Sequence, residues 1–243
     1  MEFAAFRAEM VDSLAHDTKA AVQAQSTARA MREVPRHEFV EEGRRAYTDQ
    51  SLEHRGTRVL APSTVGRLVD ALAPAEDDDV LVVGAGVGYT AAVLAEIVGA
   101  ERVHAVDIDR QVVYDARSNL ADAGYGDVLV DCRDGARGFP EYAPFDRVLV
   151  EAAAVDPPAA LLDQLADGGR LVYPEGTTDQ RLVAIEDRET ASVHGPVAFA
   201  PLLVDGEQAS ALEQNRTVRE DRERAAKEAQ SRKGWEQDWI DWE

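Results

Sequence analysis

The order of apolar and polar side chains predicts different structures in successive parts of the first 72 residues. Residues 1–30 place apolar side chains at helical spacing among polar neighbours, which predicts an amphipathic helix that covers another part of the protein. Residues 34–56 combine Pro35, glycines and many charges, a composition typical of an irregular connecting segment. Residues 63–72 follow Pro62 and are expected to form a helix.

From Val80 onward, short β-rich runs alternate with longer helical patterns. This alternation predicts βαβ units with right-handed crossovers, and hence an α/β fold with a mostly parallel sheet. Because the strands are apolar throughout, we expect helices on both faces of the sheet. Two more strand-like runs, without a helix between them, predict a terminal antiparallel pair. The expected strands are residues 80–83, 102–106, 127–130, 146–150, 170–173, 181–186 and 193–203, and the expected helices are residues 89–98, 110–123 and 158–165.

Beyond residue 205 the composition shifts to mixed charge and alanine. Residues 213–233 are expected to form a solvated helix with many i,i+4 ion pairs. Three tryptophans follow at helical spacing, and they either dock into a groove of a partner protein or fold back on the same chain. These are Trp235, Trp239 and Trp242. The predicted organisation is an N-terminal helical segment (1–72), an α/β core (73–204) and a charged C-terminal extension (205–243).

The charge balance bears on the solvent and on possible partners. The chain has 46 acidic and 26 basic residues among 243, a net charge of −20. This acidity argues against binding to a nucleic-acid backbone or an anionic membrane. Only Lys19, Lys227 and Lys233 are lysines. Many carboxylates with almost no lysine are typical of proteins from a salt-saturated cytoplasm, where ions screen self-repulsion, and the alternative is an acidic protein from a GC-biased genome.

Cysteine and histidine usage excludes several chemistries. Cys132 is the only cysteine, so neither an intrachain disulfide nor a cysteine-based zinc site is possible, and the five histidines show no metal-ligand spacing. We therefore expect no metal. No apolar run reaches the roughly 18 residues that span a bilayer, and the N-terminus does not resemble a signal peptide. The sequence predicts a soluble, cytoplasmic protein.

A glycine loop follows the first expected strand of the α/β core. Gly84, Gly86 and Gly88 allow a tight turn and a close approach of a ligand to the backbone. The dinucleotide fingerprint would need glycine at position 89, where Tyr89 stands, and a phosphate-binding P-loop would need a lysine that is absent. The remaining candidate is the S-adenosylmethionine loop of Rossmann-like methyltransferases.

Acidic residues follow the next two expected strands. Asp107 is placed to hold the ribose hydroxyls of a cofactor and Asp134 to face its adenine, although a helix N-cap and a turn aspartate are the structural alternatives. Together with the loop, the two aspartates favour the cofactor hypothesis. The predicted cofactor-binding residues are Gly84, Ala85, Gly86, Gly88, Tyr89, Asp107, Ile108, Asp134 and Gly135.

Motifs between residues 34 and 202 resemble those of the protein-L-isoaspartate (D-aspartate) O-methyltransferases. The most specific are Val34-Pro-Arg-His-Glu-Phe-Val40 and Phe199-Ala-Pro-Leu202. The resemblance implies a Rossmann-like class I fold and methyl transfer from S-adenosylmethionine to the α-carboxylate of isoaspartyl residues in damaged proteins. Such a carboxylate, with a pKa of about 4, is already ionised at pH 7. Catalysis would then rest on positioning and exclusion of water rather than on a general base.

The sequence departs from the family pattern around the expected substrate site. Leu60 stands at the family's serine position beside the substrate carboxylate, and the lost hydrogen bond would cost about 1–3 kcal/mol. Val82 and Val87 replace a glutamate and a serine of the loop region. Glu151 replaces a threonine and would favour a cationic cofactor while opposing an anionic substrate.

Two basic residues are further candidates for the substrate cleft. Arg58 is either a bidentate partner for a carboxylate or a solvent-facing ion-pair residue. His37 belongs to a segment that the resemblance places near the cleft, and a packed histidine is its alternative. The leading hypothesis is an isoaspartyl carboxyl methyltransferase. Its alternatives are a divergent member that methylates another acceptor, and one that binds cofactor or protein without methyl transfer.

Overall fold

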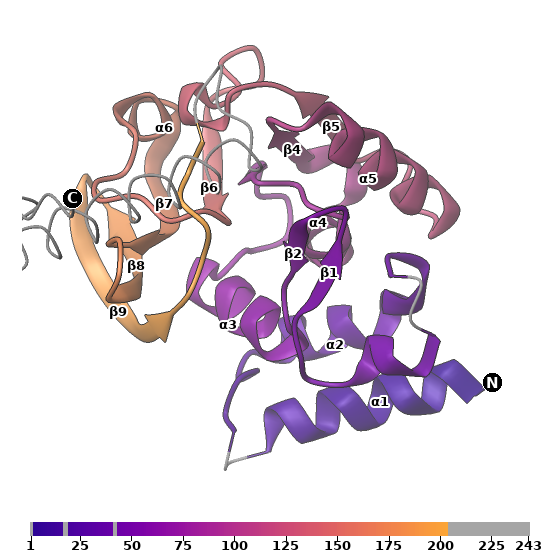
Figure 1. The fold of residues 1–243 in the computed structure, drawn as a ribbon. Helices are drawn as coiled ribbons and strands as arrows, with labels where there is room; N and C mark the ends of the chain where they lie inside the picture. Colours follow the sequence, from indigo (N-terminus) through magenta and orange to yellow (C-terminus); the bar gives the residue numbers. More distant parts are fainter. Residues whose placement is uncertain (1, 17–18, 41–42, 204–243) are drawn as a thin grey trace, which may run out of the picture. The chain divides into compact units, whose positions relative to one another are not determined.

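The computed structural model describes residues 2–16, 19–40 and 43–203, and a seven-stranded sheet organises them (Figure 1). The strand order is β5-β4-β3-β6-β7-β8-β9. The first five strands in this order are parallel, and β8 and β9 are antiparallel. The bounds are β3 (Val80–Val83), β4 (Val103–Asp107), β5 (Leu129–Cys132), β6 (Phe145–Val150), β7 (Leu165–Glu175), β8 (Gln180–Glu186) and β9 (Glu189–Val197). The predicted α/β fold with a terminal antiparallel pair is confirmed.

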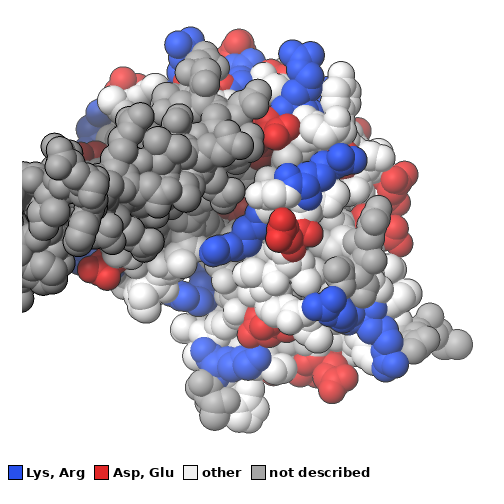
Figure 2. Space-filling model, in the orientation of Figure 1, with Lys and Arg blue, Asp and Glu red and all other residues white. Residues whose placement is uncertain are grey.

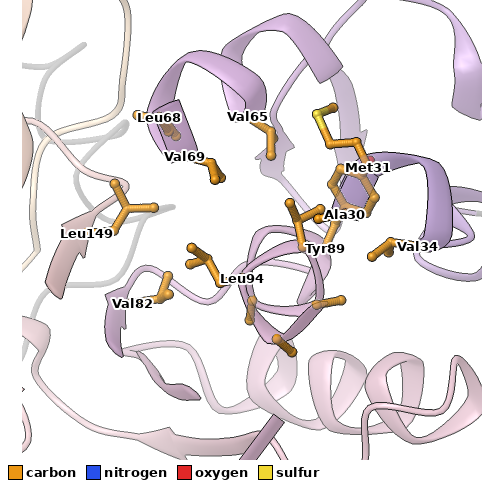
Figure 3. Packing of buried hydrophobic residues seen from close by; sticks show 14 of the residues in the cluster. Ala30, Met31, Val34, Val65, Leu68, Val69, Val82, Tyr89, Leu94 and Leu149 are labelled. Atoms are coloured by element: carbon orange, nitrogen blue, oxygen red, sulfur yellow. The ribbon is translucent and has the colours of Figure 1, made fainter. Parts of the chain in front are cut away.

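The central strand β3 is buried along its whole length, because both faces of the sheet carry a hydrophobic core. Val80 and Val82 face one cluster, and Leu81 and Val83 face the other. In Figure 3, Val69 of α3 and Leu94 of α4 lie toward Val82 and Leu149 of the sheet, and side chains of α2 pack beside Tyr89 of α4. Alternate strand residues therefore serve opposite faces, as expected for a doubly covered parallel sheet.

The strand order reverses direction at β3. From β3 the chain passes through α4 (Tyr89–Val98) to β4 and through α5 (Arg110–Asp122) to β5, and it then crosses back to β6 on the other side of β3. Carboxyl ends of parallel strands that diverge in this way leave a crevice at the edge of the sheet, where ligands of such folds bind. Short elements complete this half: η3 (Ala100–Arg102), η4 (Gly135–Arg137) and α6 (Ala159–Asp163).

The N-terminal segment differs from the single helix that its spacing predicts. It forms α1 (Glu2–Ala15) and α2 (Gln25–Glu33), joined by a connection that includes buried Ala21 and Val22. The backbone N–H groups of Gln23 and Ala24 donate to the Asp70 carboxylate at 2.5 and 3.4 Å. Because Asp70 belongs to α3 (Pro62–Leu72), a tertiary contact interrupts the helical pattern. The helix predicted for residues 63–72 is confirmed.

Residues 34–40 and 43–56, predicted to form an irregular connection, contain short regular elements, among them the first strand of a β-hairpin that the sequence did not predict. Two short 3₁₀ turns, η1 (Arg36–Glu38) and η2 (Gly43–Tyr47), precede β1 (Leu52–His54) and β2 (Thr57–Val59). The hairpin turns at Arg55 and Gly56, with φ of +49° and +77°. Positive φ at both central residues is the geometry of a two-residue hairpin turn.

The C-terminal part of the sheet corrects two predicted boundaries. The helix expected to end at residue 165 ends at Asp163, and β7 begins two residues later. The strand expected over residues 193–203 is β9, which ends at Val197. Beyond it the chain runs beside the end of β6, where Ala153 N donates to Ala200 O and Leu202 N to Ala153 O, both at 2.8 Å.

The predicted charged helix (213–233) and the tryptophan-containing tail lie outside the described residues. Met1–Gly206 forms one compact unit, and the predicted three-part organisation stays a prediction. Within the described part of the chain, no helix is both long and apolar enough to span a membrane. The same residues contain no group of three or more histidine, cysteine or acidic side chains that could hold a metal ion.

Candidate functional site

The glycine loop (Gly84–Gly88) leaves β3 at the edge where the strands diverge. Gly84 N and Ala85 N both donate to Val106 O at the end of β4, at 2.8 and 3.0 Å, and Gly88 N donates to Ala85 O at 2.9 Å. Asn119 Nδ2 of α5 donates to Val87 O at 3.0 Å. The backbone of the loop is thus anchored to the neighbouring strand and helix.

Two glycines of the loop differ in their surroundings. Gly84 has φ of +96°, and a Cβ there would lie 3.3 Å from the Glu151 Cβ. Gly86 has φ of +52° and faces open space, with nothing within 4 Å of a Cβ built on it. The loop therefore presents a bare backbone to a free volume, as a loop that cradles a ligand must.

Asp107 closes the loop from the end of β4. Its Oδ2 accepts from Gly86 N at 3.1 Å and its Oδ1 from Asp109 N at 3.0 Å, and burial raises the pKa of this carboxyl above its usual value. The helix N-cap is Asp109 instead, whose side chain accepts from Gln111 N and Val112 N of α5. The alternative role of Asp107 as a helix N-cap is therefore wrong. The partly buried carboxylate of Asp107 lies at the end of β4, beside the loop.

Asp134 lies at the end of β5 and is only 7% exposed. Its Oδ1 accepts from Ala136 N at 2.9 Å, so it caps η4 as the turn alternative expects. A Cβ on Gly135 would lie 2.4 Å from the Val83 side chain, which shows how closely this turn packs on β3. An open groove borders this turn and is lined by Cys132, Arg133, Asp134, Arg137, Gly138 and Pro140.

A second hollow, here called the pocket, adjoins the glycine loop and has about 270 Å³ of free space, part of which is open to solvent. It brings together side chains from five segments: η1, the end of β2, α3, the loop with the start of α4, and the end of β6. Its lining residues are Arg36, Arg58, Val59, Leu60, Val65, Ala85, Gly86, Val87, Tyr89, Thr90 and Glu151.

Arg36 is a fully buried cation of the pocket, and the sequence did not predict it as a site residue. Its Nε donates to Ala46 O at 2.8 Å and its Nη2 to Leu60 O at 2.7 Å, while Nη1 is buried without a partner. The guanidinium carbon lies 4.6 Å from the centre of the Tyr89 ring. Burial lowers the pKa of Arg36. A buried charge normally has a counter-ion, so the open Nη1 marks a place for an anion or a polar ligand atom.

Glu151 brings a carboxyl group into the same pocket. Burial raises its pKa to about 7, a hydrogen bond with Thr90 acts in the opposite direction, and the Asp107 charge adds to the rise. Its Oε1 is buried without a hydrogen-bond partner. The pocket therefore combines a buried cation with a carboxyl group that titrates near neutrality.

The predicted substrate-cleft residues do not all line the pocket. Leu60 and Arg58 line the pocket beside Glu151, and Arg58 is exposed, its Nη1 donating to Ala198 O at 3.0 Å. His37 is not among the lining residues. Its Nδ1 lies 2.6 Å from the Tyr47 hydroxyl, and its ring stacks on Phe3 at 4.1 Å.

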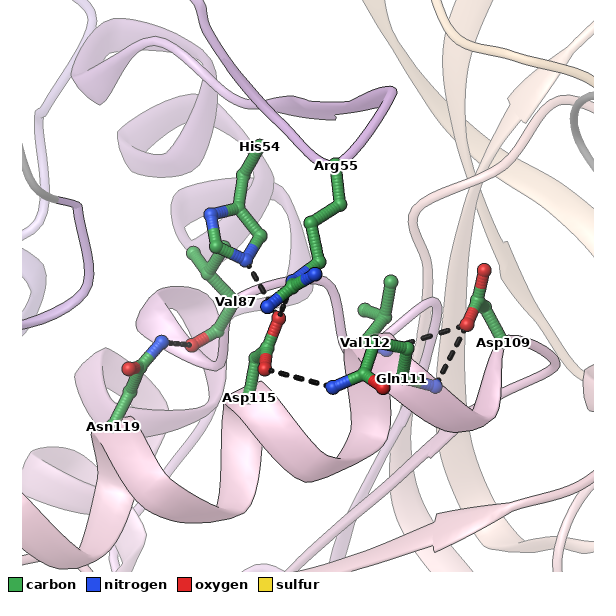
Figure 4. Close-up of polar contacts among 8 residues, drawn as sticks. All are labelled: His54, Arg55, Val87, Asp109, Gln111, Val112, Asp115 and Asn119. Carbon is green, nitrogen blue, oxygen red and sulfur yellow. Dashed lines mark hydrogen bonds and ion pairs between the residues drawn. The ribbon is translucent and has the colours of Figure 1, made fainter.

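The β1–β2 hairpin is tied to α5 by polar contacts (Figure 4). Asp115 accepts from His54 Nε2 at 2.8 Å, from Arg55 Nε at 2.5 Å and from Gln111 Nε2 at 3.3 Å. Burial acts to raise the pKa of Asp115, but the hydrogen bonds from His54 and Arg55 lower it below its usual value. This Asp115 clamp holds one wall of the pocket against the helix that supports the glycine loop.

Charges on the face shown in Figure 2 are mixed. Basic and acidic side chains of the described residues alternate there, without a continuous basic area. Nucleic-acid backbones are bound by extended basic surfaces. The described residues visible on this face do not form one.

The parallel sheet, the glycine loop at the point where the strands diverge and the acidic strand ends define a Rossmann-like class I methyltransferase fold. The protein-L-isoaspartate(D-aspartate) O-methyltransferase family model matches residues 7–208. The chain belongs to this family.

Individual relatives agree with this assignment. The chain is 40% identical over 182 residues to a protein-L-isoaspartate O-methyltransferase of Methanosarcina mazei, covering 72% of this chain and 75% of that one. It is 42% identical over 192 residues to one of Methanopyrus kandleri, covering 75% and 85%.

Solved structures show the same fold. A protein-L-isoaspartate O-methyltransferase aligns with a TM-score of 0.72 at 27% identity, covering 87% of this chain and 70% of that one. A Plasmodium falciparum structure of the same description, in complex with S-adenosyl-L-homocysteine, aligns with a TM-score of 0.70 at 20% identity, covering 81% and 98%. The second likeness supports the fold alone.

Proposed function

We propose that this protein is an S-adenosylmethionine-dependent carboxyl methyltransferase that acts on L-isoaspartyl and D-aspartyl residues of damaged proteins and so begins their repair. The observation that carries the proposal is the family match over residues 7–208. This range contains the glycine loop, both acidic strand ends and the whole pocket.

The residues at the sheet edge fit the cofactor. The open space over Gly86 admits a ligand against the backbone, and the partly buried Asp107 carboxylate is a suitable acceptor for ribose hydroxyls. Asp134 and Gly135 at the end of β5 would face the adenine, with Ile108 beside Asp107. The loop residues Gly84, Ala85, Gly86, Gly88 and Tyr89 would hold the amino-acid end. Asp107 is acidic, which suits a cationic ligand.

When bound, S-adenosylmethionine supplies an electrophilic methyl group on a positively charged sulfur. The acceptor carboxylate, with a pKa of about 4, needs no base from the protein. The pocket therefore has to place the carboxylate and exclude water from it. Leu60 and Val65 provide an apolar wall, and Arg36 fixes the position of that wall through the Leu60 carbonyl.

Two basic residues have different proposed parts in substrate binding. The exposed Arg58 at the rim of the pocket would pair with a carboxylate of the incoming peptide. His37 would act from outside the pocket, by holding Tyr47 in the segment beside it. Leu60 takes the place of the family serine as a contact of the acceptor, without its hydrogen bond.

Methyl transfer from labelled S-adenosylmethionine to an isoaspartyl peptide tests the proposal, with the sequence-matched aspartyl peptide as the control. The assay is run in multimolar KCl as well as in dilute buffer, because screening affects the stability of a chain with a net charge of −20. We expect a base-labile methyl ester on the isoaspartyl peptide only. Absence of transfer at every salt concentration, with folded protein, overturns the proposal.

The pocket lining favours one second candidate function. Leu60 offers no hydrogen bond to a carboxylate, and Glu151 adds an acidic group. Both features suit an acceptor other than an isoaspartyl carboxylate, or cofactor binding without methyl transfer. Calorimetric titration with S-adenosylmethionine separates these cases from the first, because tight cofactor binding without methylation of the isoaspartyl peptide supports the second candidate.

The cellular setting is also part of the proposal. Scarce lysine and abundant carboxylates support a cytoplasmic protein of a haloarchaeal, salt-rich cell. Damaged proteins are its proposed partners, with no nucleic acid or membrane. A further protein partner for the tryptophan-containing tail rests on the sequence alone, because that tail lies outside the described residues.

A further inference from the structure

Glu151 occupies a constrained position at the centre of the site. It directly follows β6, its backbone N–H donates to Val83 O at 2.8 Å, and its Cβ occupies space that a side chain at position 84 would need. The carboxyl group lines the pocket together with Gly86 and Leu60. Its Oε1 is buried and has no hydrogen-bond partner. A buried polar atom without a partner is costly unless a ligand completes it.

The charged and titratable groups around Glu151 leave its ionised form poorly compensated. Asp107, from the end of β4, raises the pKa of Glu151, as does burial, and the Thr90 hydrogen bond from α4 only partly offsets them. Arg36 from η1 and Arg58 from β2 line the same pocket, but they donate hydrogen bonds to backbone carbonyls. Tyr89 of α4 stays neutral, because burial raises its pKa to about 12. The neutral carboxylic acid is therefore accessible at physiological pH.

The pocket needs hydrogen-bond donors if it is to hold an anionic acceptor. The apolar side chains of Leu60, Val59, Val65 and Val87 provide none, and the Thr90 hydroxyl is engaged with Glu151. Apart from Glu151, the lining side chains that can donate are therefore Arg36, Arg58 and Tyr89. A carboxyl group in its neutral form carries an O–H and is a donor, whereas its ionised form only accepts. Enzyme sites use carboxylic acids that burial keeps neutral for this purpose.

We propose, on the basis of the function proposed above, that Glu151 acts as a neutral carboxylic acid that donates a hydrogen bond to the carboxylate of the acceptor. In this role it supplies the polar contact that Leu60 cannot make. The hydrogen bond goes to the acceptor oxygen that does not become methylated. The proton remains on Glu151 throughout, so the residue is unchanged when the ester has formed. Ionised Glu151 instead places a negative charge against the acceptor and weakens its binding.

The pH dependence of Glu151→Gln tests this role, since the amide is a donor at every pH. For the natural protein we expect kcat/KM for an isoaspartyl peptide to fall about tenfold per pH unit above neutrality, as the neutral fraction of Glu151 declines. Glu151→Gln is expected to have a flat profile between pH 6 and 9. The matched control Glu189→Gln, at an exposed position of β9, is expected to keep the natural profile.

A binding measurement provides a readout that does not depend on turnover. The isoaspartyl peptide is titrated into protein saturated with S-adenosyl-L-homocysteine at pH 8, in two buffers with different ionisation enthalpies. We expect the natural protein to take up close to one proton on binding the peptide and Glu151→Gln to take up none. If Glu151→Gln does not fold, Glu151→Thr takes its place in the test, because its hydroxyl is also a neutral donor. This variant too is expected to take up no proton.

The outcomes separate this inference from the proposed function. Peptide binding without proton uptake, or equal pH profiles for the natural protein and Glu151→Gln, overturns the inference alone. So does activity that rises through neutral pH and is lost in Glu151→Gln, because Glu151 would then act in its ionised form. Proton uptake without methyl transfer supports the inference and overturns the proposed function. Failure of the peptide to bind at any pH overturns both.

Discussion

The glycine loop and the pocket lie side by side and share Ala85, Gly86 and Val87, yet they are built in opposite ways. The loop is a continuous segment after one strand, and the N–H groups of Gly84, Ala85, Gly86 and Gly88 all donate within the protein. The pocket is assembled from five separate segments. Arg36 Nη1, the Tyr89 hydroxyl and Glu151 Oε1 are buried there without partners.

This difference indicates how the two regions function. The bonded loop is preorganised, so a ligand finds its backbone already in place. The pocket keeps buried polar atoms that make no hydrogen bond within the protein and that a bound molecule can satisfy. Variants that affect one region and not the other test the contrast.

Arg36→Lys is expected to have the largest effect. Lysine keeps the charge but cannot bridge the carbonyls of Ala46 and Leu60 with a planar fork, so a buried charge loses its fixed partners. We expect a loss of about 2–4 kcal/mol in the free energy of unfolding, measured by urea titration at constant KCl. Arg58→Lys, at the exposed rim, should stay within about 0.5 kcal/mol of the natural protein. Equal losses of stability in both variants would mean that the buried hydrogen bonds of Arg36 do not stabilise the fold more than the exposed contact of Arg58.

Gly86→Ala addresses the loop and has Gly168→Ala as its match. Both glycines have positive φ, +52° and +73°, with nothing within 4 Å of an added Cβ. Each substitution should cost about 1–2 kcal/mol of stability, because an alanine is strained in this conformation. Only Gly86→Ala should also weaken S-adenosylmethionine binding, about tenfold, measured by calorimetry. Unchanged cofactor affinity in Gly86→Ala would argue against the loop as the cofactor cradle.

Leu60→Ser tests what the apolar wall of the pocket lacks. The serine hydroxyl would give the acceptor carboxylate one more donor, worth about 1 kcal/mol, so kcat/KM for an isoaspartyl peptide should rise about fivefold. Leu60→Ala removes the same bulk without adding a hydroxyl and serves as the control. A gain of the same size in both variants would trace the effect to space and not to hydrogen bonding.

Asp115→Asn should have the smallest effect and a clear pH signature. The folded-state pKa of Asp115 lies below its unfolded value, so the clamp stabilises the fold above pH of about 4, and this contribution is lost as the pH falls through the folded-state pKa. The natural protein should lose more stability between pH 6 and pH 3 than Asp115→Asn, by less than about 1 kcal/mol. Asp122→Asn on the same helix is the control. High salt should shrink the difference.

The sequence predicted the α/β core far better than the pocket, for physical reasons. The bounds of β3 and α4 match those predicted, because an unbroken apolar run and the flanking glycines mark them locally. The strands of the hairpin have three residues each, too few for a periodic pattern. The one local indication of a hairpin turn was Gly56, which lies between the apolar residues Leu52 and Val59.

The missed and the displaced site residues have a common cause. Arg36 stands in a polar segment and looks like a surface residue, so only its tertiary contacts show that it is buried. The same contacts place His37 against Tyr47 and Phe3, away from the pocket lining. For Glu151 the sequence predicted a position near the site, whereas the burial that raises its pKa follows only from the packed structure.

The bond between Arg36 and Leu60 has a consequence for which substitutions this chain can accept. Arg36 holds the backbone carbonyl of residue 60 and not its side chain. Every amino acid carries that carbonyl, so the side chain at this position can be exchanged while the wall of the pocket keeps its place. If residue 60 contacts the acceptor as proposed, single substitutions there change that contact and leave the fold in place. Leu60 already differs from the serine of the family pattern, and saturation mutagenesis of position 60 would show which other side chains this backbone position accepts.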